Sequence, residues 1–257
     1  MRAVVRVGSV GPVVLLAVLL GGCGGVQGPS PDVGRSAVAR GPSGGPSTAA
    51  GVDGEIDPQR GFTEGELKAA LLPGEAFGRG ARVIATDLGL FGRYGGGDWT
   101  SCADGDDLRV EMRGFEGDSA QRTVRLGGAS EDGPVVTVQF VSLPGGRAER
   151  YLEIRRLLNE TCPDVTVDTD AAPVQEHHEA REVDALGDET LSESTRRTGG
   201  DEYDGDSTYV VHVRVGGVLV VVTSDGDRGT GIALAARAAE RVRAGLYGVA
   251  AGAIPVP

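Results

Sequence analysis

Lysine, cysteine and long apolar runs are scarce in this chain of 257 residues. Lys68 is its only lysine, and 37 acidic residues outnumber 25 basic ones, which gives a formal net charge of −12. Nucleic acids and anionic lipid headgroups attract positive charge, so a domain this acidic is a poor candidate for binding either one through its general field. We therefore expect no nucleic-acid partner.

The start of the chain lacks the run of about 20 apolar residues that a membrane-spanning helix requires. A shorter apolar stretch, residues 10–20, follows Arg2 and Arg6. A positive segment followed by a short apolar segment is the layout of a secretory signal peptide. We expect residues 1–22 to be such a signal and the rest of the chain to be exported.

The apolar stretch ends in Leu20-Gly21-Gly22-Cys23. These four residues resemble the bacterial lipobox, in which the cysteine thiol receives diacylglycerol and the chain is cut just before it. The expectation is a palmitate-bearing lipoprotein anchored through Cys23 to the outer face of the cell membrane. The alternative is an ordinary signal peptide whose cysteine stands there by chance.

Only three cysteines are present, an odd number that would leave an unpaired thiol in an exported protein. Assigning Cys23 to lipid leaves Cys102 and Cys162, which we expect to form a disulfide bond in an oxidising compartment. In the chain-entropy account, closing a loop of about 60 residues stabilises the fold by roughly 4 kcal/mol. The alternative is a pair of buried thiols.

Composition divides the remaining chain into three segments. Residues 23–61 begin with the cysteine to be lipidated and are dominated by Gly, Pro, Ser and Ala without apolar periodicity, so they are expected to form a disordered linker with a span of about 35 Å. Residues 62–250 suit one folded domain. Residues 251–257 form a short tail.

Periodicity within residues 62–250 predicts an α+β domain in which helices pack against an antiparallel sheet. Helices are expected over residues 64–72, where Thr63 and Glu66 form a capping box, over residues 146–159, and after Thr230, which is expected to cap the last helix. Strands are expected over residues 82–87, 108–115, 135–141, 174–186, 190–198, 208–215 and 218–224. Gly216-Gly217 predicts a tight hairpin between the last two strands.

The chain has three histidines, His177, His178 and His212. Adjacent residues of a strand point to opposite faces, so a single metal site could use only one of the first two. His212 lies between two valines, a pattern typical of a hydrogen-bonded sheet residue. We therefore expect no metal site.

Three acidic or glycine-rich segments, residues 104–107, 201–206 and 225–231, invite a calcium or phosphate interpretation. The first two do not have EF-hand spacing. The third precedes a helix but lacks the lysine of a phosphate-binding loop and carries two acids. No nucleophile has a companion base and no carboxylate pair stands out, so we expect neither an enzyme nor a cofactor.

The segment Ala185-Leu186-Gly187-Asp188-Glu189, the strand pair of residues 211–222 and the amphipathic closing helix together resemble the PknH-like extracellular sensor domain. The sites Trp99-x-x-Cys102 and Thr161-Cys162 are similar to places where that family puts cysteines. The family occurs in actinobacteria, as the outer part of receptor kinases and as separate lipoproteins. The resemblance implies an α+β domain with a ligand-binding cleft and no catalysis, although this chain has no kinase and can form only one disulfide bond.

Residues within the resembling region also have simpler structural interpretations. Gly187 is expected to take a positive φ in a turn whose acids accept from backbone amides, and Trp99 is expected to pack in the core against the disulfide bond. Ligand-binding residues are therefore left unassigned. Two functions remain: a lipid-anchored domain that binds a small molecule, glycan or lipid, with a pocket, or an accessory scaffold for an envelope protein, with an exposed apolar patch.

Overall fold

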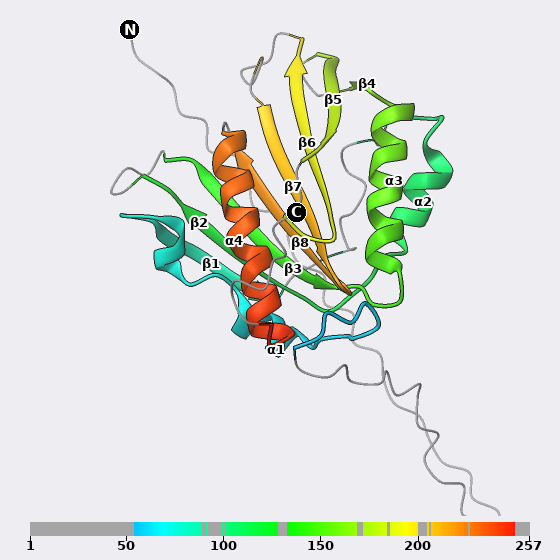
Figure 1. Cartoon of the computed structure of the whole chain (residues 1–257). Helices are drawn as coiled ribbons and strands as arrows, with labels where there is room; N and C mark the ends of the chain where they lie inside the picture. Colours follow the sequence, from blue (N-terminus) through cyan, green and yellow to red (C-terminus); the bar gives the residue numbers. More distant parts are fainter. Residues whose placement is uncertain are drawn as a thin grey trace, which may run out of the picture. The chain divides into compact units, whose positions relative to one another are not determined.

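The computed structural model describes residues 54–88, 91, 99, 101–127, 133–168, 172–183, 186–199, 205, 207–225 and 227–249. Cys23 and the tail after residue 249 lie outside this part of the chain. The described residues form one α+β domain built on an eight-stranded antiparallel sheet (Figure 1). None of its helices is long and apolar enough to cross a membrane.

The elements follow one another as α1 (Glu64–Ala70), a 3-10 helix η1 (Gly74–Phe77), β1 (Arg82–Leu88), α2 (Asp106–Arg113), β2 (Ser119–Arg125), β3 (Val135–Ser142), α3 (Arg147–Thr161), β4 (Asp164–Val167), β5 (Val174–Glu182), β6 (Glu189–Thr198), β7 (Ser207–Val215), β8 (Val218–Asp225) and α4 (Arg228–Leu246). The strands lie in the order β1-β2-β3-β8-β7-β6-β5-β4. The predicted fold class is therefore confirmed.

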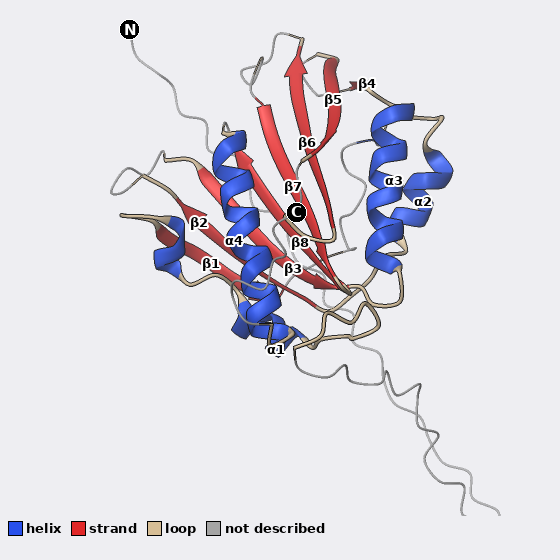
Figure 2. Ribbon diagram, viewed as in Figure 1, coloured by secondary structure: helices blue, strands red, loops and turns tan. Residues whose placement is uncertain are grey.

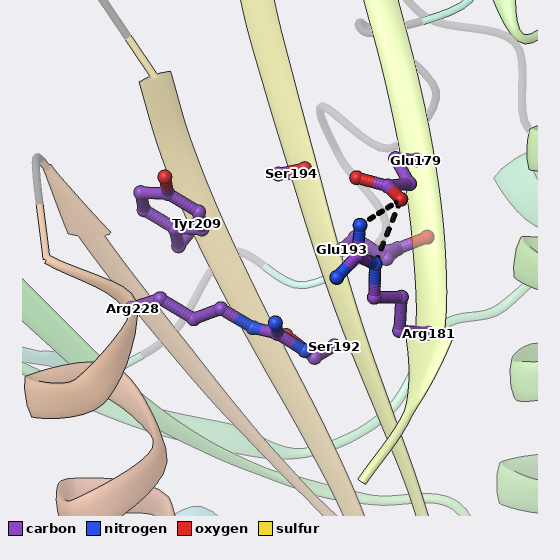
Figure 3. A pocket seen from close by; sticks show the side chains of 7 residues that line it. All are labelled: Glu179, Arg181, Ser192, Glu193, Ser194, Tyr209 and Arg228. Atoms are coloured by element: carbon purple, nitrogen blue, oxygen red, sulfur yellow. Dashed lines mark hydrogen bonds and ion pairs between the residues drawn. The ribbon is translucent and has the colours of Figure 1, made fainter.

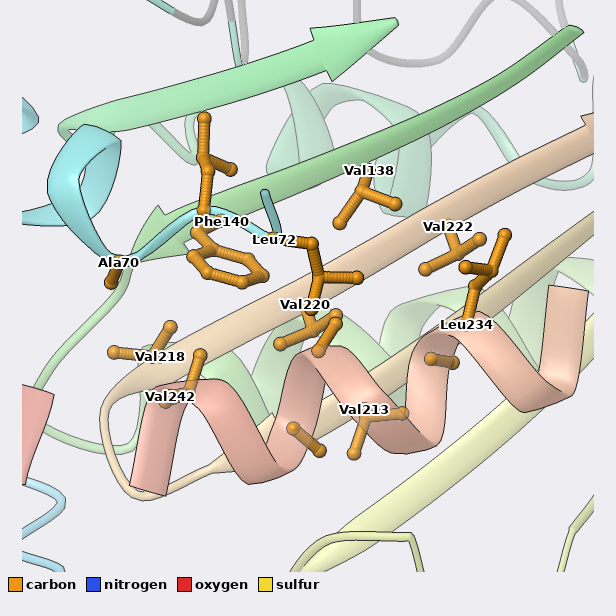
Figure 4. Close-up of a cluster of buried hydrophobic side chains, with 14 of the residues drawn as sticks. Ala70, Leu72, Val138, Phe140, Val213, Val218, Val220, Val222, Leu234 and Val242 are labelled. Carbon is orange, nitrogen blue, oxygen red and sulfur yellow. The ribbon is translucent and has the colours of Figure 1, made fainter. Parts of the chain in front are cut away.

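One face of the sheet packs against α1 and α4 (Figure 4). Alternate residues of the inner strands, such as Val138, Val220 and Val213, point toward α4, which presents Leu234 and Val242. All five are at most 3% exposed. The predicted apolar stripe of the closing helix is thus confirmed as the face that covers this half of the core.

The opposite face packs against α2 and α3. Here the other alternating set, including Val141, Leu219 and Leu191, meets Leu152 and Leu158 of α3. Figure 2 shows the resulting three layers, with the sheet between two sets of helices. A central sheet covered on both faces explains why β8 begins with five consecutive valine and leucine residues.

The two sets of helices are offset along the sheet. α4 contacts β3, β7 and β8, and α1 contacts β2 and β3, whereas α3 contacts β5 and β7 on the other face. The strands β5 and β6 therefore lie outside the cover of α4 on its own face. Their side chains on that face include Ser192, Ser194, Glu179 and Arg181, which makes this uncovered area polar.

The segment before α1 packs on the domain, starting at residue 54. The Gly54 amide donates to the carbonyl of Tyr247 at 2.6 Å, and Ile56 packs against the core. The Tyr247 hydroxyl accepts from the Gly217 amide at 3.0 Å and donates to the Val215 carbonyl at 3.3 Å. Burial raises the pKa of the Tyr247 phenol to about 12, because the charged phenolate would be poorly solvated there.

The strand predicted over residues 108–115 is wrong, because this segment forms the helix α2. Leu108, Val110 and Met112 alternate with charged residues, which suggested a strand. In the helix, Leu108 and Met112 share a face and pack in the core, whereas Val110 is 64% exposed. Asp106 and Asp107 in the first turn favour the helix because they face its positive end.

The predicted cap of the last helix is also wrong. Asp227, rather than Thr230, is the N-cap: its carboxylate accepts from the amides of Gly229 at 3.0 Å and Thr230 at 2.9 Å. The capping box of Thr63 and Glu66 is confirmed at α1. β2 and β4 were not predicted, and β5 ends at Glu182, before the predicted end at residue 186.

Candidate functional site

A polar pocket lies on the α4 face of the sheet, over β5, β6 and β7 and next to the first residue of α4 (Figure 3). It encloses about 180 Å³ and is lined by Glu179, Arg181, Ser192, Glu193, Ser194, Tyr209 and Arg228. In Figure 3 the two serines form the floor on β6, with Tyr209 and Arg228 on one side and the Glu179–Arg181 pair on the other. The pocket therefore occupies the polar area left uncovered by the offset of the helices.

Strand register brings these side chains together. Ser194 of β6 lies opposite Glu179 of β5 and Tyr209 of β7, and Ser192 lies opposite Arg181. Directly paired residues of antiparallel strands point to the same face, so the five side chains share one surface. Small hydroxyl side chains on the middle strand leave the space that the larger flanking side chains enclose.

Arg228 reaches the pocket from the first residue of α4. Its Nε donates to the Ser192 hydroxyl at 3.3 Å, which directs the guanidinium across the floor. Within the described part of the chain, its two Nη groups have no hydrogen-bond acceptor. A positioned guanidinium with open donors is a group that can bind a ligand.

The opposite wall is an ion pair between neighbours on β5. Arg181 Nε donates to Glu179 Oε1 at 2.7 Å, and its Nη2 lies 2.5 Å from the same oxygen. Both side chains are more than half exposed, so the pair contributes little to stability. Among the described residues that line the pocket, the carboxylates are those of Glu179 and Glu193. The ion pair engages Glu179, and the carboxylate of Glu193 points away from the ligand space.

Glu193 lines the floor of the pocket but directs its carboxylate to the opposite face, which α3 covers. There it accepts from Arg155 Nη2 at 2.6 Å, from Asn159 Nδ2 at 2.6 Å and lies 2.6 Å from His212 Nε2. Burial opposes ionisation, but the charges and hydrogen bonds of Arg155 and His212 outweigh it and hold the Glu193 pKa well below its usual range. The carboxylate of Glu193 therefore has a structural role, because both of its oxygens already accept hydrogen bonds within the protein.

Trp99 connects this buried network to the disulfide bond. The Arg155 guanidinium lies 4.5 Å from the Trp99 ring centroid, and the His178 ring lies 5.0 Å from it. The Cys102 amide donates to the Trp99 carbonyl at 3.0 Å, and Cys102 is bonded to Cys162 with 6.1 Å between their Cα atoms. The predicted disulfide pairing is present, and Trp99 is a core residue only 1% exposed, as expected.

A second groove, of about 320 Å³, lies between α3 and β5 on the opposite face. Glu160, Glu179 and Glu182 line it beside Arg156. The Arg156 guanidinium already binds Glu189 at 2.6 Å. This groove therefore offers mainly carboxylates to solvent, and its arginine is already paired with Glu182 and Glu189, unlike Arg228 in the pocket on the α4 face.

The three histidines lie in three different surroundings. His177 and His178 point to opposite faces of β5, as predicted: His177 lies 2.5 Å from Asp164 Oδ1, and His178 packs on Trp99. His212 is a buried residue of β7 that is hydrogen-bonded to Glu193 of β6, as its flanking valines suggested. Among the residues that the structure describes, no three His, Cys, Asp or Glu side chains converge as metal ligands would.

The acidic segments are accounted for where they are described. Asp106 pairs with Arg109 within α2, and Asp227 caps α4. The segment 201–206 lies outside the described residues, apart from Gly205. Asp106 and Asp227 therefore serve local structure.

The Gly187-Asp188-Glu189 segment is a turn, with one correction. Asp188 Oδ2 accepts from the Gly216 amide at 2.7 Å, as expected of a turn acid. The positive φ expected for Gly187 is wrong. Glycine is required there because a Cβ would collide with the carbonyl oxygen of Arg214.

Sequence reasoning missed the residues of the pocket. Ser192, Ser194, Tyr209 and Arg228 come from three separate elements and share no local motif. One signal was present: the predicted strand 190–198 has short hydroxyl side chains at alternate positions, where an interior strand normally carries apolar residues. A polar face on an interior strand indicates an uncovered surface.

No family model matches the sequence, and no curated protein does so either. Among solved structures, the extracellular domain of PknH from Mycobacterium tuberculosis is similar to this chain, with 13% sequence identity and a TM-score of 0.44. The match covers 72% of this chain and 98% of that one. Membership of the resembled family therefore stays a prediction.

Proposed function

We propose that this chain is an extracytoplasmic lipoprotein, anchored through lipid on Cys23, whose domain binds a small ligand without catalysis. The pocket beside Arg228 is the proposed binding site. The observation that supports it is a set of polar side chains from four elements that converge on one space with open hydrogen-bonding groups.

Hydroxyl groups in the pocket support binding rather than chemistry. Within the described part of the chain, the hydroxyls of Ser194 and Tyr209 have no hydrogen-bond partner, and no histidine lines the pocket. A serine nucleophile requires a companion base within hydrogen-bond reach. The proposed role of these hydroxyls is therefore to hold a ligand.

The alternative, a scaffold for an envelope protein, predicts an exposed apolar patch of several hundred Å². The large apolar side chains that are exposed in the described part are Val83, Ile84 and Val110. The first two lie on β1, whereas Val110 lies on α2, at the opposite side of the domain in Figure 1. This distribution favours the ligand-binding proposal.

Native mass spectrometry of the full-length chain, purified from its own cell envelope, tests the proposal. We expect a discrete, reproducible mass above that of the lipidated polypeptide, and a loss of that mass on unfolding. A chain that carries only its own lipid, and whose melting temperature does not respond to soluble envelope extracts, would overturn it.

A further inference from the structure

We infer that the pocket binds an oxyanion, a phosphate or carboxylate group of the ligand, through the guanidinium of Arg228. This inference rests on the proposed function, because it names the chemical class of ligand for the same site. It follows from the groups that remain available once the bonds within the protein are made.

Donors exceed acceptors in the pocket. Arg228 lines the pocket and uses only its Nε, in the bond to Ser192, so both Nη groups have no acceptor in the described part of the chain and remain available to a ligand. The hydroxyls of Ser194 and Tyr209 are each able to donate a further hydrogen bond. Two guanidinium nitrogens and two hydroxyls match the several lone pairs of one oxyanion.

The nearby carboxylates that the structure describes are engaged, so they do not compete for Arg228. Glu179 binds Arg181, and Asp227 accepts from the amides of Gly229 and Thr230 at the start of α4. The carboxylate of Glu193 lies on the other face of the sheet with Arg155. Among the residues that the structure describes, Arg228 is thus the cation lining the pocket that no carboxylate engages, whereas Arg181 is paired with Glu179.

The proposed site uses side chains rather than the end of α4. Because the Asp227 carboxylate already accepts from the first open amides of that helix, those amides do not face the ligand. The bond that Arg228 Nε donates to Ser192 fixes the guanidinium before a ligand arrives, which reduces the entropy lost on binding. An end-on pair of bonds from the two Nη groups suits a carboxylate or a phosphate equally.

The test is an NMR amide-shift titration of the full-length chain in a nonionic detergent. The probes are inorganic phosphate, acetate, the neutral sugar maltose, and phosphatidylglycerol added to the micelles. We expect saturable shifts at the amides of Ser194, Tyr209 and Arg228 with an anion. A response to soluble anions alone indicates a free ligand, and a response to the lipid indicates a headgroup.

Arg228→Gln should weaken anion binding by about 10- to 100-fold, because it removes charge-assisted hydrogen bonds. Tyr209→Phe, which keeps all charges, should weaken it by a smaller factor. Arg237→Gln is the matched control, since Arg237 is exposed on the same helix and binds the Ala76 carbonyl instead. The control should bind as the unmodified chain does.

The outcomes separate this inference from the proposed function. If maltose shifts these amides and no anion does, the pocket binds ligands but the oxyanion assignment is wrong. If anions bind equally well to Arg228→Gln with its melting temperature preserved, the assignment is also wrong. If no probe shifts these amides, the inference fails, and native mass spectrometry decides separately whether the domain carries a ligand at all.

Discussion

Arg155 of α3 and Glu193 of β6 form a buried ion pair, with 2.6 Å between Nη2 and Oε2 and both side chains less than 10% exposed. The pair lies directly behind the pocket, because the same Glu193 residue lines the pocket floor. It joins α3 to the strand that carries both serines. The position of the floor therefore depends on an interaction made on the other face of the sheet.

Breaking this pair by changing one partner should strongly destabilise the domain. We expect Arg155→Met or Glu193→Leu to lower the free energy of unfolding by about 3–5 kcal/mol, because each leaves a buried charge without the partner of its ion pair. The double variant should recover a large part of the loss, since neither charge is then buried. Urea denaturation followed by circular dichroism measures all three.

The control for this comparison is Glu153→Gln on the same helix. Glu153 pairs with Arg150 at 2.7 Å, but its side chain is 56% exposed. Such a surface pair contributes at most about 1 kcal/mol. Equal losses from Glu153→Gln and Glu193→Leu would contradict the structural role assigned to the buried pair.

Ionisation of Glu193 should contribute to the dependence of the free energy of unfolding on pH. Its pKa is held below the ordinary value in the folded state, so its contribution is fully present above about pH 4.5, the range of an unfolded glutamate, and is lost as the pH falls below it. Glu193→Gln should flatten the free energy of unfolding over this acidic range. Glu153→Gln should retain the original slope, and two identical slopes would refute the assignment.

Trp99 should report on the disulfide bond, because it is the only tryptophan and lies in the same cluster as Cys102. Breaking the bond with the pair of changes Cys102→Ser and Cys162→Ser should lower the free energy of unfolding by about 2–4 kcal/mol. It should also shift the Trp99 fluorescence to longer wavelength as water reaches the ring. Cys23→Ser, which leaves the disulfide bond intact, should leave both quantities unchanged.

Gly187 should not tolerate a side chain. Gly187→Ala places a methyl group against the carbonyl oxygen of Arg214. This oxygen belongs to the backbone, so it cannot move aside as the end of a flexible side chain could. We expect the free energy of unfolding, measured by thermal denaturation, to fall by about 1–3 kcal/mol. Gly65→Ala in α1, where a Cβ meets nothing within 4 Å, should instead stabilise by about 0.4–1 kcal/mol.

The sequence was most informative where one face of an element is apolar. The closing helix, the β7–β8 hairpin at Gly216-Gly217 and the strand at residues 135–141 were predicted within a few residues. The β2 strand was missed because only Ala120 and Val124 of its seven residues are buried and apolar. Its partners across the sheet, rather than its own pattern, determine its conformation.

The residues of the pocket could not be predicted in the same way. Arg228, Ser194 and Tyr209 lie far apart in the sequence and meet only through strand register and the position of α4. The disulfide bond was predictable because counting left only Cys102 and Cys162. A site that forms only through tertiary packing has no comparable local pattern in a single sequence.

Filling the pocket is the most direct test of the central claim. In Ser194→Trp, the indole would occupy much of the space of about 180 Å³. Thr208→Trp is the matched control, since Thr208 is exposed on β7 and adjoins Tyr209, so it points to the other face. Native mass spectrometry of both chains from their own envelope should show bound ligand lost from Ser194→Trp and retained by Thr208→Trp. Equal ligand occupancy in the two folded variants would contradict the account.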